Sequence, residues 1–302
     1  MFSSPYKVML ESNVLKNIFN QTVINHYFEL EVAKALDSKL VRPPIYLSIG
    51  TEHIPPSILA AFNSANFSFK DYAIFPQHRC HSYYLTFGGD PTSLALELCG
   101  SIKGCNKGMG GSASVSNTKT ANLFGHSGLL GDQVPISVGY AHASHMPTVV
   151  IMGDATAEED YVLGALGFAA TKNVPILFLC EDNNLSILTE KKIRRSWNIV
   201  NVALGFGIDS IEIHDQPSEI YKQVLEFVQN PKPTLINILC QRHRWHAGSG
   251  IDNEPKWNTY EELVKTVQNE FGNKFVSEML LQINSSISTI WDSIAYECSR
   301  NN

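Results

Sequence analysis

Apolar and polar residues alternate along the second half of the chain in blocks that predict strands and helices in turn. Short runs rich in β-branched residues, such as 147–152 (PTVVIM) and 174–180 (VPILFLC), are separated by longer stretches with apolar residues at helical spacing. Further strands are predicted at 209–214 and 234–240, and helices at 133–145, 157–173, 197–206 and 217–230. This alternation predicts the α/β class, with a parallel sheet that carries helices on both faces.

The first half of the chain has a less regular pattern. It predicts one long helix or two within 8–36, helices at 55–65 and 90–102 with Asp90 or Thr92 as the cap of the latter, and a short strand at 71–75. A Gly-, Ser- and Asn-rich stretch follows at 103–132, and a loop of this length is usually functional. The chain from Thr259 onward is predicted to be helical, so we expect residues 1–302 to form a single domain with N-terminal helices and a helical C-terminal extension.

Composition narrows the class of protein. The 302 residues are 44% apolar and 17% charged, which supports a sizeable core, and the net charge of -6 with only short basic clusters argues against a nucleic-acid partner. Residues 1–10 lack the apolar run of a secretory signal, and no apolar run is long enough to span a bilayer. Six scattered cysteines without a CxxC pair predict reduced thiols and a cytoplasmic location.

Polar residues follow two consecutive predicted strands. Gly153 and Asp154 come directly after the run 147–152, and Asn183 follows the run 174–180. Because parallel strands end at the same edge of a sheet, where open α/β sheets bind their ligands, Asp154 and Asn183 are expected to lie close together. Carboxylate and amide oxygens suit Mg²⁺ shared with phosphate oxygens, and Gly153 would let a diphosphate approach the backbone. The spacing alone equally allows Asp154 to cap a helix and Asn183 to make a turn.

A family resemblance favours the ligand-binding interpretation. The stretch 153–183 resembles the thiamine diphosphate motif, and the chain looks like the α subunit of the thiamine diphosphate-dependent component of 2-oxoacid dehydrogenases, such as the pyruvate, branched-chain and acetoin enzymes. Four further segments resemble this family in the same order: GTEHIPPSI, HRCHSYYLTFGGDPTSLALELCGSIKGCNKGMGGS, GLLGDQVPISVGYA and RHRWHAG. The resemblance covers roughly Tyr46 to Gly248.

The resemblance implies two cofactors, thiamine diphosphate and Mg²⁺, and assigns roles to particular positions. The implied Mg²⁺ ligands are Asp154, Asn183 and the backbone carbonyl of Leu185. The implied contacts of thiamine diphosphate are Gly153, Ala155 and Thr156 through their backbone, His78 and Arg79 at phosphate oxygens, Gly128 and Leu130 at the aminopyrimidine, and His246 at the thiazolium. The implied catalytic residues are His246 and, close to the same region, His81.

Some positions depart from the commonest pattern of the family and leave the substrate open. Ala155 replaces a glycine, Glu158 and Glu159 stand where pyruvate enzymes often have Asn-Gln, and Tyr46 stands where many relatives have a histidine. The segment GDATAEED is closer to relatives that act as transketolase-like ligases in sugar metabolism. Three functions therefore remain: a subunit that decarboxylates a 2-oxo acid and transfers the acyl unit, a transketolase-like carboligase subunit acting on a sugar-derived substrate, and a non-catalytic assembly subunit.

The resemblance also implies a partner. In this family the glutamate that protonates the cofactor's pyrimidine comes from a separate pyrimidine-binding domain, and the matched segments cover only the diphosphate-binding domain. We therefore expect a β-type subunit in an α₂β₂ assembly, and in the first alternative a lipoyl acyltransferase as a further partner. Glu52, in GTEHI, is the one internal glutamate that could replace the partner's, but its place in the motif predicts a position away from the pyrimidine.

Overall fold

Five parallel strands form the centre of the molecule. The computed structural model describes residues 10–252 and 254–300, with no description of the side chains of 297–300. The sheet has the order β1-β2-β3-β7-β6, and every neighbouring pair is parallel. Its strands are β1 (Ala73–Phe75), β2 (Thr148–Gly153), β3 (Ile176–Asp182), β7 (Thr234–Leu239) and β6 (Asp209–His214). The predicted α/β class with a parallel sheet is confirmed.

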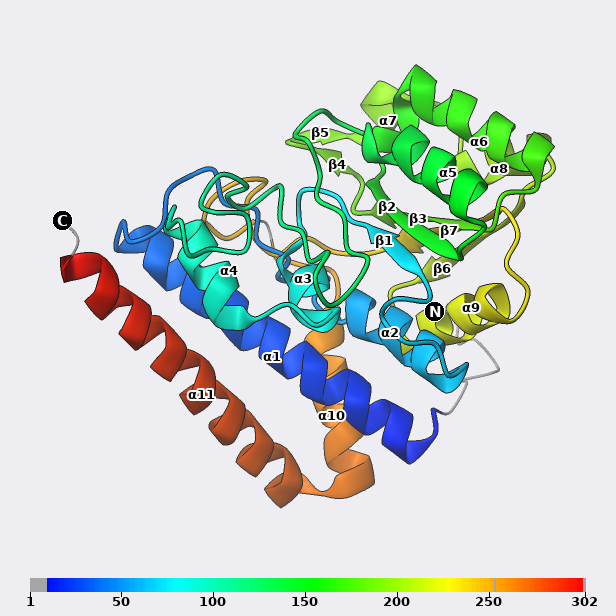
Figure 1. The fold of residues 1–302 in the computed structure, drawn as a ribbon. Helices are drawn as coiled ribbons and strands as arrows, with labels where there is room; N and C mark the ends of the chain where they lie inside the picture. The colour runs from blue at the N-terminus through cyan, green and yellow to red at the C-terminus, as the bar shows by residue number, and fades with distance from the viewer. Residues whose placement is uncertain (1–9, 253, 301–302) are drawn as a thin grey trace.

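Alternate residues of the four strands β1, β2, β3 and β7 pack into two separate hydrophobic cores, one on each face of the sheet. Helices cover both faces (Figure 1). Val150 and Met152 pack on the face covered by α5 (Gln133–Ser144), α6 (Asp160–Lys172) and α8 (Ile199–Gly205). Val149 and Ile151 pack on the opposite face, against α2 (Ile54–Ser64) and α9 (Pro217–Gln229). Because both of their faces are buried, β2 and β3 are apolar along most of their length, as the sequence pattern indicated, whereas the edge strand β6 is largely exposed.

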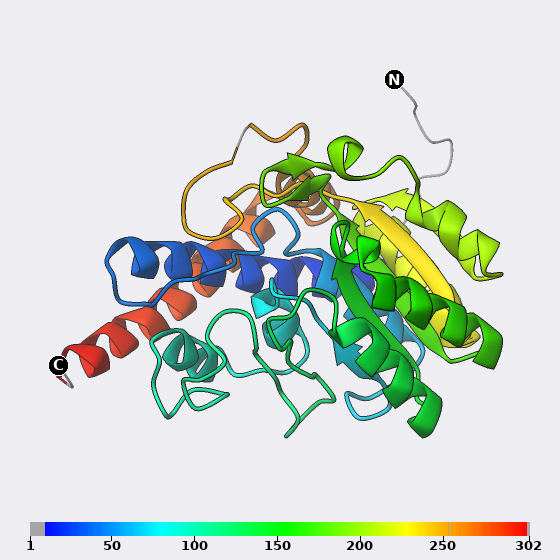
Figure 2. The same cartoon turned by 90° about the horizontal axis from the view of Figure 1, so that it is seen from above.

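A layer of long helices lies beyond α2. It consists of α1 (Ser12–Asp37), α10 (Thr259–Phe271) and α11 (Asn273–Arg300), and α1 runs beside α11 well away from the sheet (Figures 1 and 2). The N-terminal apolar pattern therefore forms one helix, since its apolar stripe continues unbroken from Leu15 to Ala35. None of the helices in the described part of the chain is long and apolar enough to cross a membrane.

The smaller elements lie around the carboxyl edge of the sheet or beside it. They are α3 (His81–Thr86), α4 (Pro91–Leu98), a 3₁₀ turn η1 (Thr156–Glu158), the hairpin of β4 (Leu185–Ser186) and β5 (Thr189–Glu190), and α7 (Lys191–Arg194). Asp90 caps α4 by accepting a hydrogen bond from the Ser93 amide at 2.8 Å, as expected. The sequence pattern did not predict α3, the hairpin or α7, because each is too short to show a period.

The helix between β2 and β3 begins later than the sequence predicted. The helix predicted from residue 157 begins at Asp160, so the placement of Glu158 and Glu159 in its first turn is wrong: Glu158 ends η1, and Glu159 is the residue before α6. Residues 1–9, which hold nearly all of the stretch that lacks the pattern of a secretory signal, lie outside the described part.

Candidate functional site

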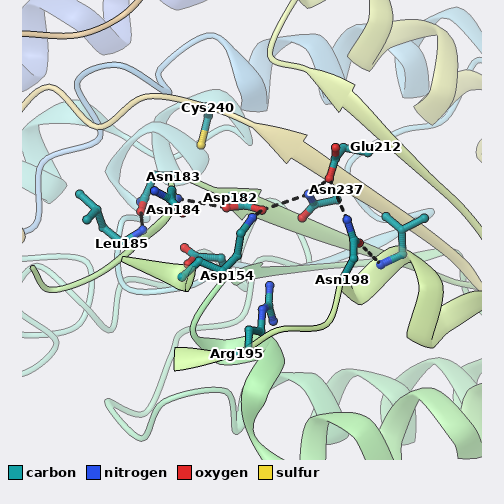
Figure 3. Close-up of polar contacts among 12 residues, drawn as sticks. Asp154, Asp182, Asn183, Asn184, Leu185, Arg195, Asn198, Glu212, Asn237 and Cys240 are labelled. Atoms are coloured by element: carbon teal, nitrogen blue, oxygen red, sulfur yellow. Dashed lines mark hydrogen bonds and ion pairs between the residues drawn. The ribbon is translucent and has the colours of Figure 1, made fainter. Parts of the chain in front are cut away.

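The polar ends of β2 and β3 lie side by side. Gly153 pairs with Glu181 in the parallel register, so the residues that follow, Asp154 and Asn183, emerge at the same edge of the sheet (Figure 3). They line a small cavity of about 60 Å³ whose walls come from the ends of β2, β3 and β7 and from the segment after β1. Asp154 and Asn183 therefore lie at the carboxyl edge of the sheet, the edge at which open α/β folds bind their ligands.

The cavity gathers most of the residues that the sequence singled out. Its lining includes His78, Arg79, Leu130, Gly153, Asp154, Ala155, Thr156, Asn183, Leu185 and His246. Two expected site residues do not line it, namely Gly128 and His81. Gly128 has a left-handed backbone (φ +95°), and its amide donates to His126 Nδ1 at 2.9 Å.

Asp154 is a buried carboxylate with a cationic neighbour. Its residue exposure is only 1%, and its Oδ2 accepts a hydrogen bond from Nη2 of Arg194 in α7. Burial, and next the nearby carboxylate of Asp182, raise the pKa of Asp154 to about 6, although Arg194 acts in the opposite direction. The charge of Asp154 is therefore costly in this position and needs cations close by.

The residues after β3 form a compact turn. The Leu185 amide donates to Asn183 Oδ1 at 3.0 Å, and the Asn184 amide donates to Asp182 Oδ1 at 3.0 Å. Asp182 also accepts a hydrogen bond from Asn237 Nδ2 at 3.1 Å and contacts Nζ of Lys191. Both the turn and the ligand interpretation of Asn183 are compatible with this geometry, because an amide oxygen has a second lone pair.

Two imidazoles and a phenol ring meet beside the cavity. The ring centroid of Tyr46 lies 4.9 Å from that of His78 and 5.5 Å from that of His246, and the two imidazole centroids are 5.4 Å apart. Burial, together with the Arg79 charge, lowers the pKa of His246 to about 4 and holds the pKa of His78 well below its ordinary value. Both rings are therefore neutral at pH 7.

Arg79 and His81 connect the segments that surround the cavity. Arg79 donates to the carbonyl of Leu47 at 2.8 Å and to the carbonyl of His246 at 3.0 Å, which ties the His246 loop to the segment before α2. His81 is fully buried, with its ring nitrogens 3.2 Å from a Glu29 carboxylate oxygen and 2.9 Å from Ser112 Oγ. His81 reaches the cavity only indirectly, because Ser112 Oγ accepts from the amide of Tyr46.

Several residues at the site were missed from the sequence. Gln77 lines the cavity and donates to Glu181 at 2.5 Å, and Arg242 lines it while its Nε lies 2.5 Å from Asp252. Arg194 contacts Asp154 without lining the cavity. The sequence carried only a weak signal for these residues. Arg242 lies two residues after the predicted strand 234–240, and Arg194 belongs to the short basic run 191–195.

The residues present fit the Mg²⁺ and diphosphate that the resemblance implies. Asp154 with its carboxylate, Asn183 with its amide oxygen and Leu185 with its backbone carbonyl all line one cavity. Such hard oxygen ligands suit Mg²⁺. The described residues contain no group of three or more His, Cys, Asp or Glu side chains that could hold a metal, so the fit depends on these neutral oxygens beside Asp154. In addition, the buried Nε2 of His78 has no hydrogen-bond partner in the described part of the chain, so this polar atom needs one from elsewhere.

Comparison with known proteins places these residues in a family. The family model described as "Dehydrogenase E1 component" matches residues 28–282. A mitochondrial pyruvate dehydrogenase E1 component subunit alpha from Chaetomium thermophilum is 27% identical over 269 residues, covering 86% of this chain and 62% of the relative. The subunit alpha-1 from Oryza sativa subsp. japonica, also mitochondrial, is 29% identical, covering 82% and 64%, and the subunit alpha from Rickettsia conorii is 28% identical, covering 70% and 71%. The chain thus spans only about three fifths of the length of the first two relatives.

Proposed function

The chain belongs to the dehydrogenase E1 component family, and from this membership we propose that it is the α-type subunit of a thiamine diphosphate-dependent enzyme that decarboxylates a 2-oxo acid and passes on the acyl unit. The observation that carries the proposal is the meeting of Asp154, Asn183, Leu185 and His246 at one cavity on the carboxyl edge of the sheet. A non-catalytic assembly subunit would have no need to bring these four positions together.

We propose that this chain holds the diphosphate end of the cofactor through Mg²⁺. Asp154, the Asn183 amide oxygen and the Leu185 carbonyl would bind the metal, while the backbone at Ala155 and Thr156 would face the diphosphate. When bound, thiamine diphosphate would supply a nucleophilic carbon and an electron sink for the decarboxylation. His246, neutral at pH 7 because burial and Arg79 lower its pKa to about 4, would orient the reacting groups and accept a proton.

We further propose that the site is completed by a second, β-type subunit in an α₂β₂ assembly. The cavity of about 60 Å³ is far smaller than the roughly 300 Å³ or more of ordinary cofactor pockets. Glu52, the internal glutamate considered above, does not line it, and its carboxylate pairs with His26 Nδ1 at 2.6 Å. Exposed apolar side chains near this edge, Leu129 on the glycine-rich loop and Leu188 on the hairpin, would be covered by such a partner.

The names of the relatives favour a 2-oxo acid as the substrate class over a sugar-derived acceptor. Each relative reported above is named as a pyruvate dehydrogenase subunit alpha. Glu158 is one of the positions where the chain departs from pyruvate enzymes. Its Oε1 lies 2.6 Å from Nη1 of Arg194, so Glu158 forms an ion pair with the basic helix α7. The departures therefore need not imply a different reaction. The cytoplasmic location stays a prediction, since the relatives include mitochondrial proteins.

Binding of the cofactor tests the proposal directly. Calorimetric titration with thiamine diphosphate in the presence of Mg²⁺ should show binding to the unaltered chain, and Asp154→Ala should weaken it more than about tenfold because the charged metal ligand is lost. Asp160→Ala, which removes an exposed carboxylate six residues on, is the matched control and should bind normally. Equal affinities for the Asp154 variant and the control would exclude the assigned metal site.

A further inference from the structure

The basic helix α7 places cations against the acidic ends of two strands. Lys191 Nζ contacts Oδ2 of Asp182, at the end of β3, and Arg194 Nη2 contacts Oδ2 of Asp154, just after β2. Arg194 Nη1 also lies 2.6 Å from Oε1 of Glu158 in η1. The side chain of Arg194 is only 12% exposed. The guanidinium therefore bridges the two carboxylates, Asp154 and Glu158, in a position sheltered from water.

Arg194 approaches Asp154 from outside the cavity. Asp154, Asn183 and Leu185 all line the cavity, whereas no residue of α7 does. Arg194 uses only Oδ2 of the carboxylate, and within residues 10–252 and 254–300 the other oxygen, Oδ1, takes part in no hydrogen bond. Arg194 is therefore placed to hold the Asp154 carboxylate while one oxygen remains for a ligand in the cavity.

The same arginine connects the two halves of the proposed metal site. Asp154 directly follows β2, whereas Asn183 directly follows β3 and Leu185 begins β4. The β4–β5 hairpin pairs Leu185 with Glu190, and the Lys191 amide donates to the Asn184 carbonyl at 3.0 Å, so α7 is fixed to the β3 half. Through Arg194 this half is then bound to Asp154 and Glu158, which lie forty and thirty-six residues earlier in the chain.

We propose that Arg194 is a positioning residue for the divalent-metal site. It fixes the rotamer of Asp154, balances the charge of the neighbouring carboxylates and holds the Asn183–Leu185 segment at a constant separation from Asp154. Groups that orient a metal ligand typically affect metal affinity by about 10- to 100-fold. This inference rests on the proposed function, because it assumes that Asp154 binds a metal ion. An arginine that merely competed with the metal would lie between Asp154 and the cavity, and its removal would tighten metal binding.

The test measures Mn²⁺ binding rather than turnover. The full chain is titrated with Mn²⁺ in the presence of thiamine diphosphate, and free Mn²⁺ is followed by its electron paramagnetic resonance signal. Arg194→Ala should weaken Mn²⁺ binding by about 10-fold or more. Arg194→Lys should recover part of the loss, since an ammonium can satisfy only one of the two carboxylates at a time. The matched control is Lys192→Ala, an exposed cation of the same helix that pairs with Glu190 and should leave Mn²⁺ affinity unchanged.

The outcomes separate this inference from the proposed function. If the unaltered chain binds Mn²⁺ and Arg194→Ala binds it equally well or more tightly, the positioning role is excluded while the proposed function stands. If the unaltered chain binds no Mn²⁺ with thiamine diphosphate even when its β-type subunit is present, both fall. Should Arg194→Ala fail to fold, Glu158→Gln takes its place: it removes the second anchor of the guanidinium and should weaken Mn²⁺ binding by a smaller factor, and unchanged binding in that variant would overturn the proposal.

Discussion

At the scale of single residues, the chemistry of the candidate site depends on what surrounds each ionisable group. Burial raises the pKa of Asp154 toward 6 and lowers the pKa of His246 toward 4, so both neutral forms are favoured by the same physical cause. Arg194 then opposes this effect at Asp154, whereas Arg79 reinforces it at His246. Neither outcome can be obtained from the residue types alone.

His246 should matter for turnover more than for cofactor binding. Its loop is attached to Arg79 through its carbonyl, so replacing the side chain with alanine leaves that attachment intact. We expect His246→Ala to lower turnover of the assembled enzyme by about 10²-fold or more, in the range for acid–base groups, with little change in the affinity for thiamine diphosphate. Steady-state kinetics beside calorimetry measure the two effects, and normal turnover would leave His246 with a purely structural role.

The same histidine should make stability depend on pH. The unfolded imidazole titrates near its ordinary value of about 6.5, whereas the folded one resists protonation until about pH 4. Between these values the unfolded chain binds more protons, so the stabilisation present above pH 6.5 is lost as the pH falls toward 4.

Urea unfolding at pH 7 and pH 4.5 checks this expectation. His246→Gln should lose less unfolding free energy over this interval than the unaltered chain. His142→Gln, at an exposed position of α5, is the control and should follow the unaltered chain. Parallel losses in all three proteins would contradict the assignment.

At the scale of elements, the glycine-rich segment after α4 is organised by one buried carboxylate. Glu97 is 1% exposed, and its two oxygens accept four backbone amides, those of Asn106, Gly108, Gly110 and Gly111, at 2.7 to 3.1 Å. Gly108 needs its left-handed backbone (φ +74°), and a Cβ there would lie 2.5 Å from the Gly100 carbonyl oxygen. The amides of this turn are therefore directed at Glu97, so this part of the glycine-rich segment is wrapped around an internal anion.

Glu97→Gln should destabilise the protein. The amide nitrogen that replaces one carboxylate oxygen cannot accept, so at least one buried backbone N–H loses its partner, which costs about 1–3 kcal/mol. Denaturant unfolding measures the change. Glu261→Gln, in the first turn of α10 on an exposed position, is the comparison and should shift the unfolding free energy by less than about 0.5 kcal/mol. Equal stabilities of the two variants would mean that the loop does not depend on the carboxylate.

At the scale of the whole molecule, the site lies at one edge of the sheet and the long helices lie away from it. The helix α1 is packed within the chain against α2, α10 and α11, so its apolar stripe needs no partner. Exposed apolar side chains occur on the helices of the sheet half, including Ile136 on α5 and Phe168 on α6, and also on α11, where Leu281 is exposed. Because the site lies at the edge of the sheet, a partner subunit that completes it would contact the sheet half of the molecule.

The isolated chain should therefore be inactive. We expect thiamine-dependent decarboxylation of 2-oxo acids only when the chain is co-purified with a β-type subunit. No glutamate of the described residues lines the cavity, and two buried glutamates already have partners: Glu181 is held by Tyr83 and Gln77, and Glu52 by His26. Assays of the chain alone and of the co-purified complex measure this. Full turnover by the isolated chain would refute the divided site, and loss of that turnover in Glu52→Gln would then identify the internal acid.

The sequence by itself determined the periodic features of this protein. Continuous apolar runs of six or seven residues predicted β2, β3 and β7, because strands buried on both faces need no polar side. The polar residues after these strands predicted the edge at which the site lies, since parallel strands end together. Helical spacing of apolar residues likewise predicted the helix between β2 and β3, in which Val162, Ala165, Leu166 and Ala169 are buried.

Only the tertiary structure decided which charges meet. Arg194 and Asp154 are separated by forty residues, and nothing in the periodicity relates them; the short hairpin and α7 that bring them together carry too few residues to show a pattern. His81 likewise acquired its role from distant partners, Glu29 and Ser112, and Glu97 acquired its role from the amides of the loop that follows it. The physical reason is that periodicity reports burial, which is local along an element, whereas ion pairs and hydrogen bonds depend on distances that exist only after the elements have packed.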